Sequence, residues 1–218
     1  MAHHRTAILT SMEHAPMPGA EQLVEPLRSR WSPSIFDDQH HLTHEQISTV
    51  LHAAQWSPSS GNSQPWAFVV AERGSASHQV LVAHLSRGNA GWVPRASVVL
   101  IATTQVAPDA DGNGGRNEAL ACYDLGQAAA HVTLQARAMD LHAHQFGGFD
   151  QVAVAAALGV PDHVRVLSGI AIGVRGDPAE VSERDQEREQ HPRARKPLAE
   201  MVHGDAWGEP WPPAGQTL

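Results

Sequence analysis

Apolar residues recur every three or four positions in three segments of the chain, which is the spacing of one face of an α-helix. The first segment, residues 42–55, also places Thr43 and Gln46 in the spacing of a capping box near its start. A longer segment covers residues 117–141, and a shorter one covers residues 151–158. The pattern therefore predicts three amphipathic helices.

Runs of β-branched and other apolar residues alternate with these helices along the chain. Residues 67–73, 96–106 and 169–176 have the composition of buried strands. Residues 107–117 are rich in Gly, Asp and Asn, which predicts an exposed connector. Residues 177–197 are so densely charged that we expect an exposed, partly extended excursion. The pattern indicates a mixture of helices and strands without fixing how the strands pair.

Length and composition limit the class of protein. A chain of 218 residues with a hydrophobic fraction of 42% can bury one sizeable core, and we expect a single domain. The single cysteine, Cys122, excludes an internal disulfide and a multi-cysteine metal site, and it suits a reducing compartment. Residues 1–20 lack a signal-peptide core, and no apolar run approaches the ~18 residues of a membrane span. The expected location is the cytoplasm.

The charge balance bears on possible partners. A formal net charge of −8 argues against nonspecific binding to nucleic acid, which requires an excess of Lys and Arg. Because basic residues are scarce, local clusters of them are informative. Arg28 and Arg30 form one cluster, and the RARK run at residues 193–196 forms another.

The chain contains 15 histidines, some of them in spacings that resemble metal-ligand sets, namely His40, His41 and His44, and His142 with His144. No cysteine cluster or carboxylate-plus-histidine helix motif accompanies them, so compositional bias is the preferred interpretation. The sequence also lacks the Gly-x-Ser-x-Gly elbow, the Gly-x-Gly-x-x-Gly turn and the Walker A loop. We therefore predict no metal and no catalytic side chain.

The stretch RSRWSPSIF, residues 28–36, places an arginine two residues before a serine in a predicted turn. Such a pair supplies a bidentate cation, a hydroxyl and free backbone N–H groups, which together can hold a phosphate. Taken alone, a solvated arginine and a turn serine are the default interpretation.

The stretch WSPSSGNSQPW, residues 56–66, gathers hydrogen-bonding groups directly before a predicted strand. Its two prolines restrict the backbone and lower the ordering cost of binding. Such a polar edge suits a flat heterocycle with imide-like donors and acceptors, and a well-ordered structural turn is the alternative. The donors and acceptors come from Ser59, Ser60, Asn62 and Gln64.

Five segments occur in the order and spacing of the FMN-dependent nitroreductase family, which the chain resembles from about residue 27 to residue 202. They are RWSPSIF, WSPSSGNSQPWAFVV, GNAGWVPRASVVLIA, YDLGQAAAHVTLQARAMDLHAHQFGGFD and PRARKPL. The PSSGNSQPW element is the most specific part. The resemblance implies an α+β fold with a central mixed β-sheet flanked by helices, in an intertwined homodimer with two FMN sites at the interface.

The resemblance also implies a division of the chain and a set of cofactor-binding residues. Residues 27–203 form a single FMN-binding domain, preceded by an N-terminal extension at 1–26 and followed by a Pro- and Trp-rich tail at 204–218. The FMN phosphate is held by Arg30, Ser32, Arg193 and Arg195, with Trp31 contacting the cofactor. The flavin ring is lined by Pro58, Ser59, Ser60, Asn62 and Gln64 of the other subunit, by Asn89 near the pyrimidine end, and by Gln145, Phe146, Gly147 and Gly148 on the face opposite the substrate.

One position departs from the family pattern. Ser34 stands where the family often has a second basic residue, so the pyrimidine end of the flavin loses a cation there. The activity implied is transfer of a hydride from NADH or NADPH through FMN to a nitroaromatic, quinone or similar small-molecule acceptor by a ping-pong route. Two alternatives stay open. One is another reaction of this fold, such as enone or aldehyde reduction, reductive dehalogenation or flavin fragmentation. The other is flavin binding without turnover.

Overall fold

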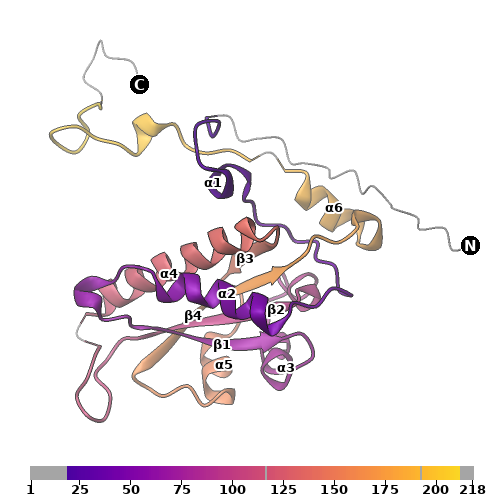
Figure 1. Ribbon diagram of the computed structural model, residues 1–218, viewed down its shortest axis with the longest axis horizontal. Helices are drawn as coiled ribbons and strands as arrows, with labels where there is room; N and C mark the ends of the chain where they lie inside the picture. The colour runs from indigo at the N-terminus through magenta and orange to yellow at the C-terminus, as the bar shows by residue number, and fades with distance from the viewer. Residues whose placement is uncertain (1–18, 116, 192, 212–218) are drawn as a thin grey trace, which may run out of the picture.

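The centre of the protein is a four-stranded β-sheet, seen in a computed structural model that describes residues 19–115, 117–191 and 193–211 (Figure 1). Its order is β1-β2-β4-β3, and every pairing among the described strands is antiparallel. The expectation of a mixed sheet is therefore wrong for the strands of this chain. The reason is that β4 lies between β2 and β3 and runs opposite to both. The strands are β1 (Trp66–Glu72), β2 (Val98–Gln105), β3 (His142–Phe146) and β4 (Val164–Gly173).

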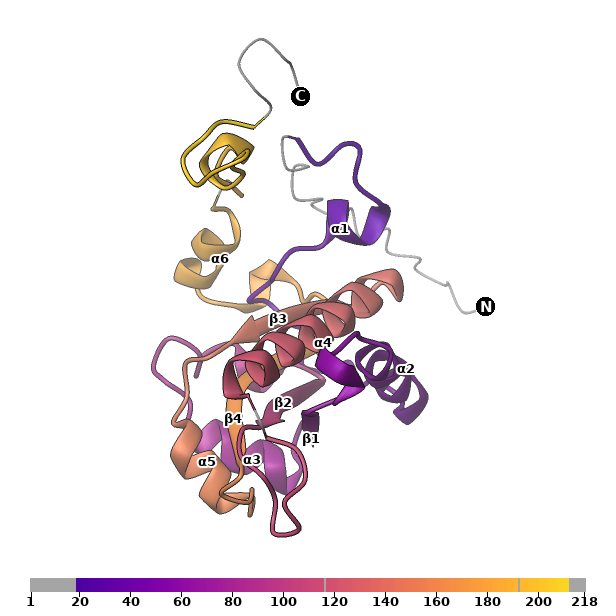
Figure 2. The ribbon, with the colours of Figure 1, turned by 90° about the vertical axis from the view of Figure 1, so that its left-hand side faces the viewer.

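Helices cover both faces of this sheet, which gives an α+β fold of three layers (Figure 2). On one face lie α2 (His44–Gln55) and α4 (Glu118–Ala138), which pack on each other and bury Leu100 and Ile170 of the sheet. On the other face, α3 (Ala76–Ala83) and α5 (Gln151–Ala157) cover the alternate strand residues. Alternate residues of β2 and β4 therefore belong to two separate cores, as the twofold periodicity of a strand requires.

The helix starts follow from local side-chain caps. The predicted capping box is confirmed, because the Thr43 hydroxyl accepts from the Gln46 N–H at 3.1 Å and the Gln46 side chain accepts from the Thr43 N–H at 2.9 Å. Asn117 caps α4 and Asp150 caps α5 in the same way, through side-chain oxygens. The three predicted helices and two of the three predicted strands are confirmed to within three residues at their ends. The strand expected at residues 169–176 is also present as β4, but it starts five residues earlier, at Val164. The strand β3 and the helices α1 (Glu25–Ser29), α3 and α6 (Glu183–Glu189) were not predicted.

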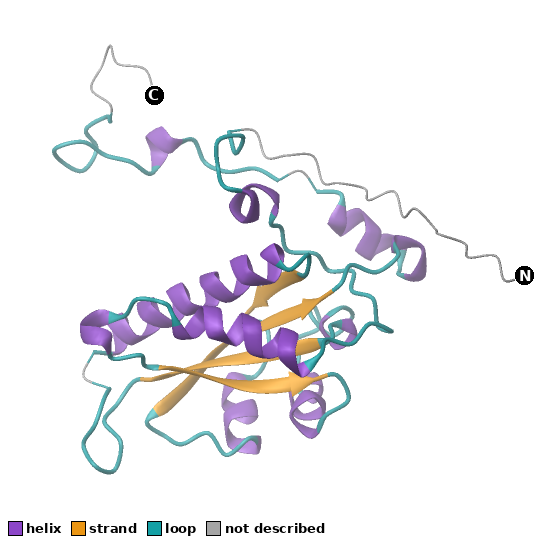
Figure 3. Ribbon diagram, in the orientation of Figure 1, coloured by secondary structure: helices purple, strands orange, loops and turns teal. Residues whose placement is uncertain are grey.

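Several short elements lie beyond one edge of the sheet (Figure 3). These are α1 (Glu25–Ser29) near the N-terminal side and α6 (Glu183–Glu189) near the C-terminal side. The charged segment expected to be exposed and partly extended contains the helix α6, which is capped by Ser182 because the Ser182 side chain accepts from the Asp185 N–H. The remaining elements are single 3₁₀ turns, η1 (Ser60–Asn62), η2 (Val93–Arg95), η3 (Pro178–Glu180) and η4 (Leu198–Glu200).

Among the described residues, no helix is long and apolar enough to cross a membrane. Most of the expected N-terminal extension, residues 1–18, and the end of the expected tail, residues 212–218, lie outside the described residues.

Candidate functional site

The two ends of the domain meet in a cavity of about 220 Å³. It is lined by residues of the RSRWSPSIF stretch on one side and by α6 and the RARK run on the other. The structure therefore brings together six of the predicted cofactor residues, from segments about 160 positions apart in the sequence. The lining residues are Arg30, Trp31, Ser32, Ser34, His144, Arg188, Glu189, His191, Arg193 and Arg195.

Backbone pairing explains why these segments meet. Residues 35–37 lie against the end of β4, with the Asp37 N–H donating to the Val174 carbonyl at 3.0 Å and the Gly176 N–H donating to the Ile35 carbonyl at 3.1 Å. The chain that leaves β4 toward α6 must therefore start beside Ser34. The Arg193 guanidinium then closes the cavity by donating to the Arg30 carbonyl at 2.8 Å.

The cavity concentrates positive charge. Burial lowers the pKa of Arg30 from its ordinary value, and the nearby charges of Arg195 and Arg193 lower that pKa further. Burial and Arg195 also lower the pKa of Arg193. The Arg30 side chain donates to the Ser32 hydroxyl at 3.1 Å, while its buried Nε has no hydrogen-bond partner in the described part of the chain. Three guanidiniums that repel one another favour an anion between them.

Glu189 is a member of this site that the sequence reasoning missed. Its carboxylate is only 7% exposed and accepts a hydrogen bond from the backbone N–H of Ser34. Arg175 approaches it, with Nε 3.9 Å from Oε2. Burial raises the pKa of Glu189, partly offset by the hydrogen bond from Ser34 and the charge of Arg175. In a segment dense with charged residues, no local signal separates this buried carboxylate from its exposed neighbours.

His144 forms one wall of the cavity instead of a metal site. Its ring stacks on Trp92 with the centroids 4.2 Å apart, and Nδ1 lies 2.7 Å from the Pro33 carbonyl, to which it donates in the corresponding tautomer. Burial lowers the pKa of His144, which favours the neutral ring. Within the described ranges, no three His, Cys, Asp or Glu side chains form a group that could hold a metal ion.

The PSSGN loop, residues 58–62, is fastened to α4 at two points, one within the loop and one at Ser57, the residue that precedes it. The Ser60 N–H donates to the carboxylate of Asp124 at 3.0 Å, and the Ser57 hydroxyl contacts Nδ1 of His131. Asp124 and His131 are seven residues apart, so they lie on the same face of α4 two turns from each other. Sequence reasoning missed both anchors, because a helical Asp and a helical His carry no signal of a distant loop.

Left-handed backbone conformations give the loop its shape. Asn62 has a φ of 56° and Gln64 a φ of 46°, and such values are uncommon for residues other than glycine. The Gln64 N–H donates to the Ser59 hydroxyl at 3.0 Å, and the Gln64 side chain donates to the Asn62 carbonyl at 3.2 Å. Pro58 restricts the entry to the loop. These bonds hold the polar groups of the loop in one fixed arrangement.

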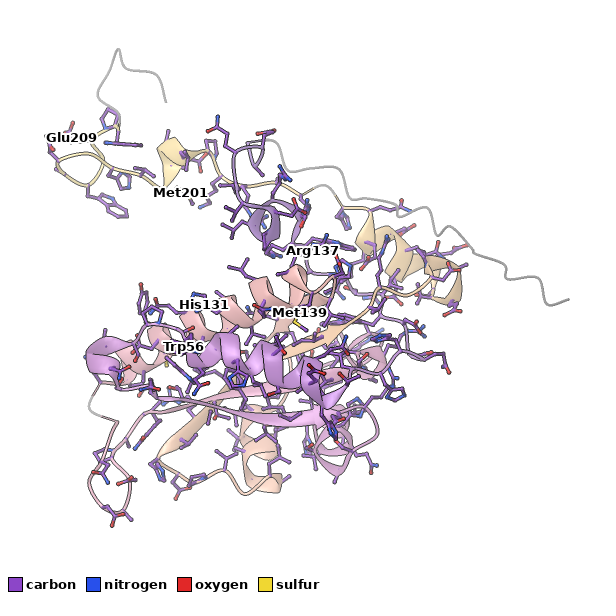
Figure 4. All side chains as sticks on the ribbon, in the orientation of Figure 1. Trp56, His131, Arg137, Met139, Met201 and Glu209 are labelled. Atoms are coloured by element: carbon purple, nitrogen blue, oxygen red, sulfur yellow. The ribbon has the colours of Figure 1, made fainter. Side chains whose placement is uncertain are left out.

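The loop and the arginine cavity lie toward opposite ends of α4. The loop is fastened at Asp124, whereas α1 is fastened by the Arg137 guanidinium, which donates to the Ser29 hydroxyl at 2.7 Å. These anchors are 13 residues apart on the helix, or about 20 Å. Figure 4 shows Trp56, which precedes the loop, and Arg137 separated in this way. The loop contributes no residue to the lining of the arginine cavity.

The third group of predicted residues surrounds the end of β3. Asn89 donates to the Gly148 carbonyl at 3.0 Å and accepts from the Trp92 indole at 3.2 Å, so it joins two loops within the chain. A side chain on Gly148 would collide with Asn89 and Ser86, whereas Gly147 faces open space. A side chain at position 148 would therefore displace the Asn89 amide from its hydrogen bond to the Gly148 carbonyl.

The remaining residues of this group differ in exposure. Gln145 is exposed, and its side chain donates to the Thr133 hydroxyl of α4 at 2.9 Å. The ring of Phe146 is buried and packs in the core against Trp92 and Phe149. The outer edge of β3 therefore offers a ligand the Gln145 side chain and backbone, but not the ring of Phe146.

Comparisons with known proteins agree with the fold. The profile of the nitroreductase family matches residues 27–174. An "uncharacterized 15.4 kDa protein in ask 5'region" of Mycolicibacterium smegmatis is 35% identical over 126 residues, which cover 58% of this chain and 81% of that protein. The "oxygen-insensitive NAD(P)H nitroreductase" of Salmonella typhimurium is 34% identical over 123 residues, 48% of this chain and 55% of that enzyme. The second match spans about half of the enzyme's length.

Solved structures give the same picture. A crystal structure described as "the oxidoreductase containing FMN" superposes with a TM-score of 0.75 at 33% identity, covering 83% of this chain and 90% of the other. A protein of Exiguobacterium sibiricum solved in complex with FMN has a TM-score of 0.66 at 18% identity, covering 81% and 93%. At that lower identity the likeness extends to the fold alone.

Proposed function

Because the chain belongs to the nitroreductase family, we propose that it is an FMN-dependent oxidoreductase that carries a hydride from NADH or NADPH to a nitroaromatic, quinone or similar oxidised acceptor. The observation that carries this proposal is the cluster of Arg30, Arg193 and Arg195, three of the four arginines that line one cavity, which suits a phosphate dianion. FMN, when bound, supplies the hydride chemistry, and the protein binds and orients it. The solved relatives that contain FMN support the choice of cofactor.

In this proposal the phosphate lies between the two ends of the domain. Arg30 and Ser32 hold it from one side, and Arg193 and Arg195 hold it from the other. The buried Nε of Arg30, which lacks a hydrogen-bond partner in the described part of the chain, is one donor available to it. Trp31 and Ser34 line the same cavity and contact the phosphate-bearing side chain of the cofactor.

The ring of the flavin lies outside this cavity. At about 220 Å³ the cavity falls below the ~300–1,000 Å³ typical of pockets that enclose a whole ligand of this size. A second copy of the chain completes the site in a homodimer, by bringing its PSSGN loop to the ring. Pro58, Ser59, Ser60, Asn62 and Gln64 would then contact the ring edge, and Asn89, Gln145, Phe146, Gly147 and Gly148 would line it from the first subunit.

Exposed aromatic residues support a dimer. Trp56 is 84% exposed and Tyr123 is 67% exposed, and both lie near the PSSGN loop, on α2's end and on α4. Trp207, in the C-terminal segment, is 91% exposed. Large aromatic surfaces are costly to leave in water, so these residues favour burial against a second subunit. The single cysteine suits a reducing compartment, and we place the protein in the cytoplasm.

The first test identifies the cofactor and the reductant. The purified protein, reconstituted with flavin, should retain FMN in preference to FAD and riboflavin, measured by chromatography of the flavin released on denaturation. Under anaerobic conditions NADH or NADPH should bleach the bound FMN at a rate at least as high as that of steady-state turnover. A quinone added afterwards should restore the colour of the oxidised flavin. A protein that retains FMN but is reduced slowly by both nicotinamides would instead be a flavin-binding protein without turnover.

The second test addresses the shared site. Co-expression of a tagged Arg30→Ala chain with a differently tagged Asn62→Ala chain should give heterodimers with one intact site and one doubly damaged site. Such heterodimers should bind about half a flavin per chain with wild-type affinity, measured by absorbance titration. Affinity equal to that of the two mutant homodimers would show that each site is built within one subunit.

A further inference from the structure

A second cavity adjoins the arginine cavity. It measures about 440 Å³ and lies between α6 and the loop of residues 86–92. Arg188 and His191 line both cavities, so the two are neighbours separated by these side chains. The guanidinium of Arg188 lies 6.0 Å from the centre of the Trp92 ring and donates to the Gly88 carbonyl at 3.3 Å. Arg188 thus forms the partition between the two cavities.

Positive charge gathers in this second cavity, which is unusual in a chain with a net charge of −8. Arg87 comes from the loop, and Arg184 and Arg188 come from α6. In residues 19–115, 117–191 and 193–211, no ion pair or hydrogen bond engages the guanidinium of Arg87 or Arg184. The guanidiniums of Arg87 and Arg184 therefore keep their donors available for an anion, and the Arg188 guanidinium keeps those donors that do not bond to Gly88.

Two carboxylates, Asp185 and Glu187, also line the cavity, so the arginines outnumber them by one. Asp185 accepts a hydrogen bond from the Ser182 hydroxyl at 2.7 Å at the start of α6, and among the described residues neither carboxylate forms an ion pair with the arginines of the cavity. Gly88 and Gly91 form part of the wall, and a side chain at either position would meet no atom within 4 Å. A ligand can therefore approach the backbone of the loop closely.

From this arrangement we propose that the second cavity binds the phosphate groups of the reducing dinucleotide, through Arg87, Arg184 and Arg188. The inference rests on the proposed function, because it takes NADH or NADPH as the hydride donor. A volume of about 440 Å³ lies within the range of pockets that hold nucleotide-sized ligands. The dinucleotide would then be anchored by its phosphates beside the flavin cavity.

Two sources of phosphate can fill this cavity. The pyrophosphate is common to NADH and NADPH, whereas the 2′-phosphate belongs to NADPH alone. Loss of an arginine that contacts the pyrophosphate weakens the binding of NADH and NADPH equally. Loss of an arginine that contacts the 2′-phosphate weakens the binding of NADPH and leaves that of NADH unchanged.

The experiment compares FMN-loaded wild type with Arg87→Ala and Arg184→Ala. The matched control is Arg165→Ala, an exposed arginine that pairs with Glu118 far from either cavity. Rates of anaerobic flavin reduction are measured with NADH, NADPH and N-benzyl-1,4-dihydronicotinamide, a hydride donor that has no phosphate. Binding of inorganic pyrophosphate to the FMN-loaded, oxidised protein is measured separately by calorimetry.

Each cavity variant should raise the dissociation constant of pyrophosphate or the half-saturating concentration of NADPH by roughly tenfold, as expected for a charge-assisted hydrogen bond. Reduction by the benzyl compound should be unchanged, as should every measurement on Arg165→Ala. If all three donors reduce wild type and the variants equally and pyrophosphate affinity is unchanged, the phosphate site is wrong and the proposed function stands. If no donor reduces the wild-type flavin, the proposed function itself fails.

Discussion

The arginine cavity and the PSSGN loop are two halves of one candidate site that the chain builds in different ways. The cavity joins residues 30–34 to residues 188–195 across the whole domain and is held by few direct contacts. The loop is close in sequence to the strand it precedes and is fastened to one helix by a buried carboxylate and a histidine. The cavity is dominated by repulsion between like charges, whereas the loop is held by hydrogen bonds to α4 and within itself.

This difference predicts how each half responds to change. A cluster of like charges is stabilised by the anion that it binds. Substitution of one of its arginines should therefore change ligand affinity more than it changes the free energy of unfolding. A loop held by buried hydrogen bonds is already ordered before a ligand binds. Substitution of the residues that fasten it should therefore lower the free energy of unfolding, and should weaken ligand binding only as a consequence of that loss.

The largest expected effect is on FMN binding by Arg30→Ala. Loss of this half-buried guanidinium removes one or two charge-assisted hydrogen bonds to the phosphate, which together contribute about 3 kcal/mol to the free energy of binding. The dissociation constant of FMN should therefore rise by over a hundredfold, on the order expected for that energy. Riboflavin lacks the phosphate, so its affinity should hardly change. Absorbance titration of the apoprotein with both flavins gives the two constants.

The matched control for that experiment is Arg28→Ala, since Arg28 is exposed and pairs with Glu25 within α1. Its flavin affinities should equal those of wild type. Equal losses of FMN and riboflavin in Arg30→Ala would mean that Arg30 holds the fold and not the phosphate.

The next effect is on stability through the buried carboxylate of α4. Asp124→Ala leaves the Ser60 N–H without its acceptor and should lower the free energy of unfolding by about 2 kcal/mol. Asp162→Ala, an exposed aspartate on a turn, should change it by less than about 0.5 kcal/mol. Urea unfolding at one fixed protein concentration measures both. If the free energy of unfolding of Asp124→Ala equals that of wild type, the hydrogen bond from the loop to α4 does not contribute to stability.

The second anchor of the loop should matter less. Ser57→Ala removes the hydroxyl that contacts His131, and the partly exposed imidazole can then bond to water. The expected loss is about 1 kcal/mol in the free energy of unfolding. Ser63→Ala, whose exposed hydroxyl lies on the same loop, provides the comparison, and a loss equal in the two variants would contradict a specific role for Ser57.

The smallest effect concerns pH. Burial raises the pKa of Glu189, so its contribution to stability is present below the ordinary pKa of a glutamate and is lost as pH rises through the raised pKa. Glutamine at this position does not titrate, so the stability of Glu189→Gln relative to wild type should increase as pH rises from the ordinary pKa of a glutamate through the raised pKa of Glu189. Urea unfolding over that range tests this. Glu187→Gln, at an exposed position two residues away, should show no such trend.

Sequence reasoning located three of the helices, three of the strands and the clusters of candidate residues because their signals are local. Thr43 and Gln46 cap α2 whatever lies beyond them, and the apolar spacing of residues 117–141 requires a buried helix face. The scarcity of basic residues also pointed to Arg30 and to the RARK run, since each cluster can be recognised from neighbouring residues alone.

Only the tertiary structure decided which of these residues meet. The insertion of β4 between β2 and β3 made the sheet of this chain antiparallel, and the pairing of residues 35–37 with the end of β4 brought α6 to Ser34. Glu189 is buried beside Ser34, whereas Glu187 lies on the opposite side of α6 and is exposed, although both belong to one run of charges. Burial and long-range contact depend on the path of the whole chain, and no local pattern of residue types records that path.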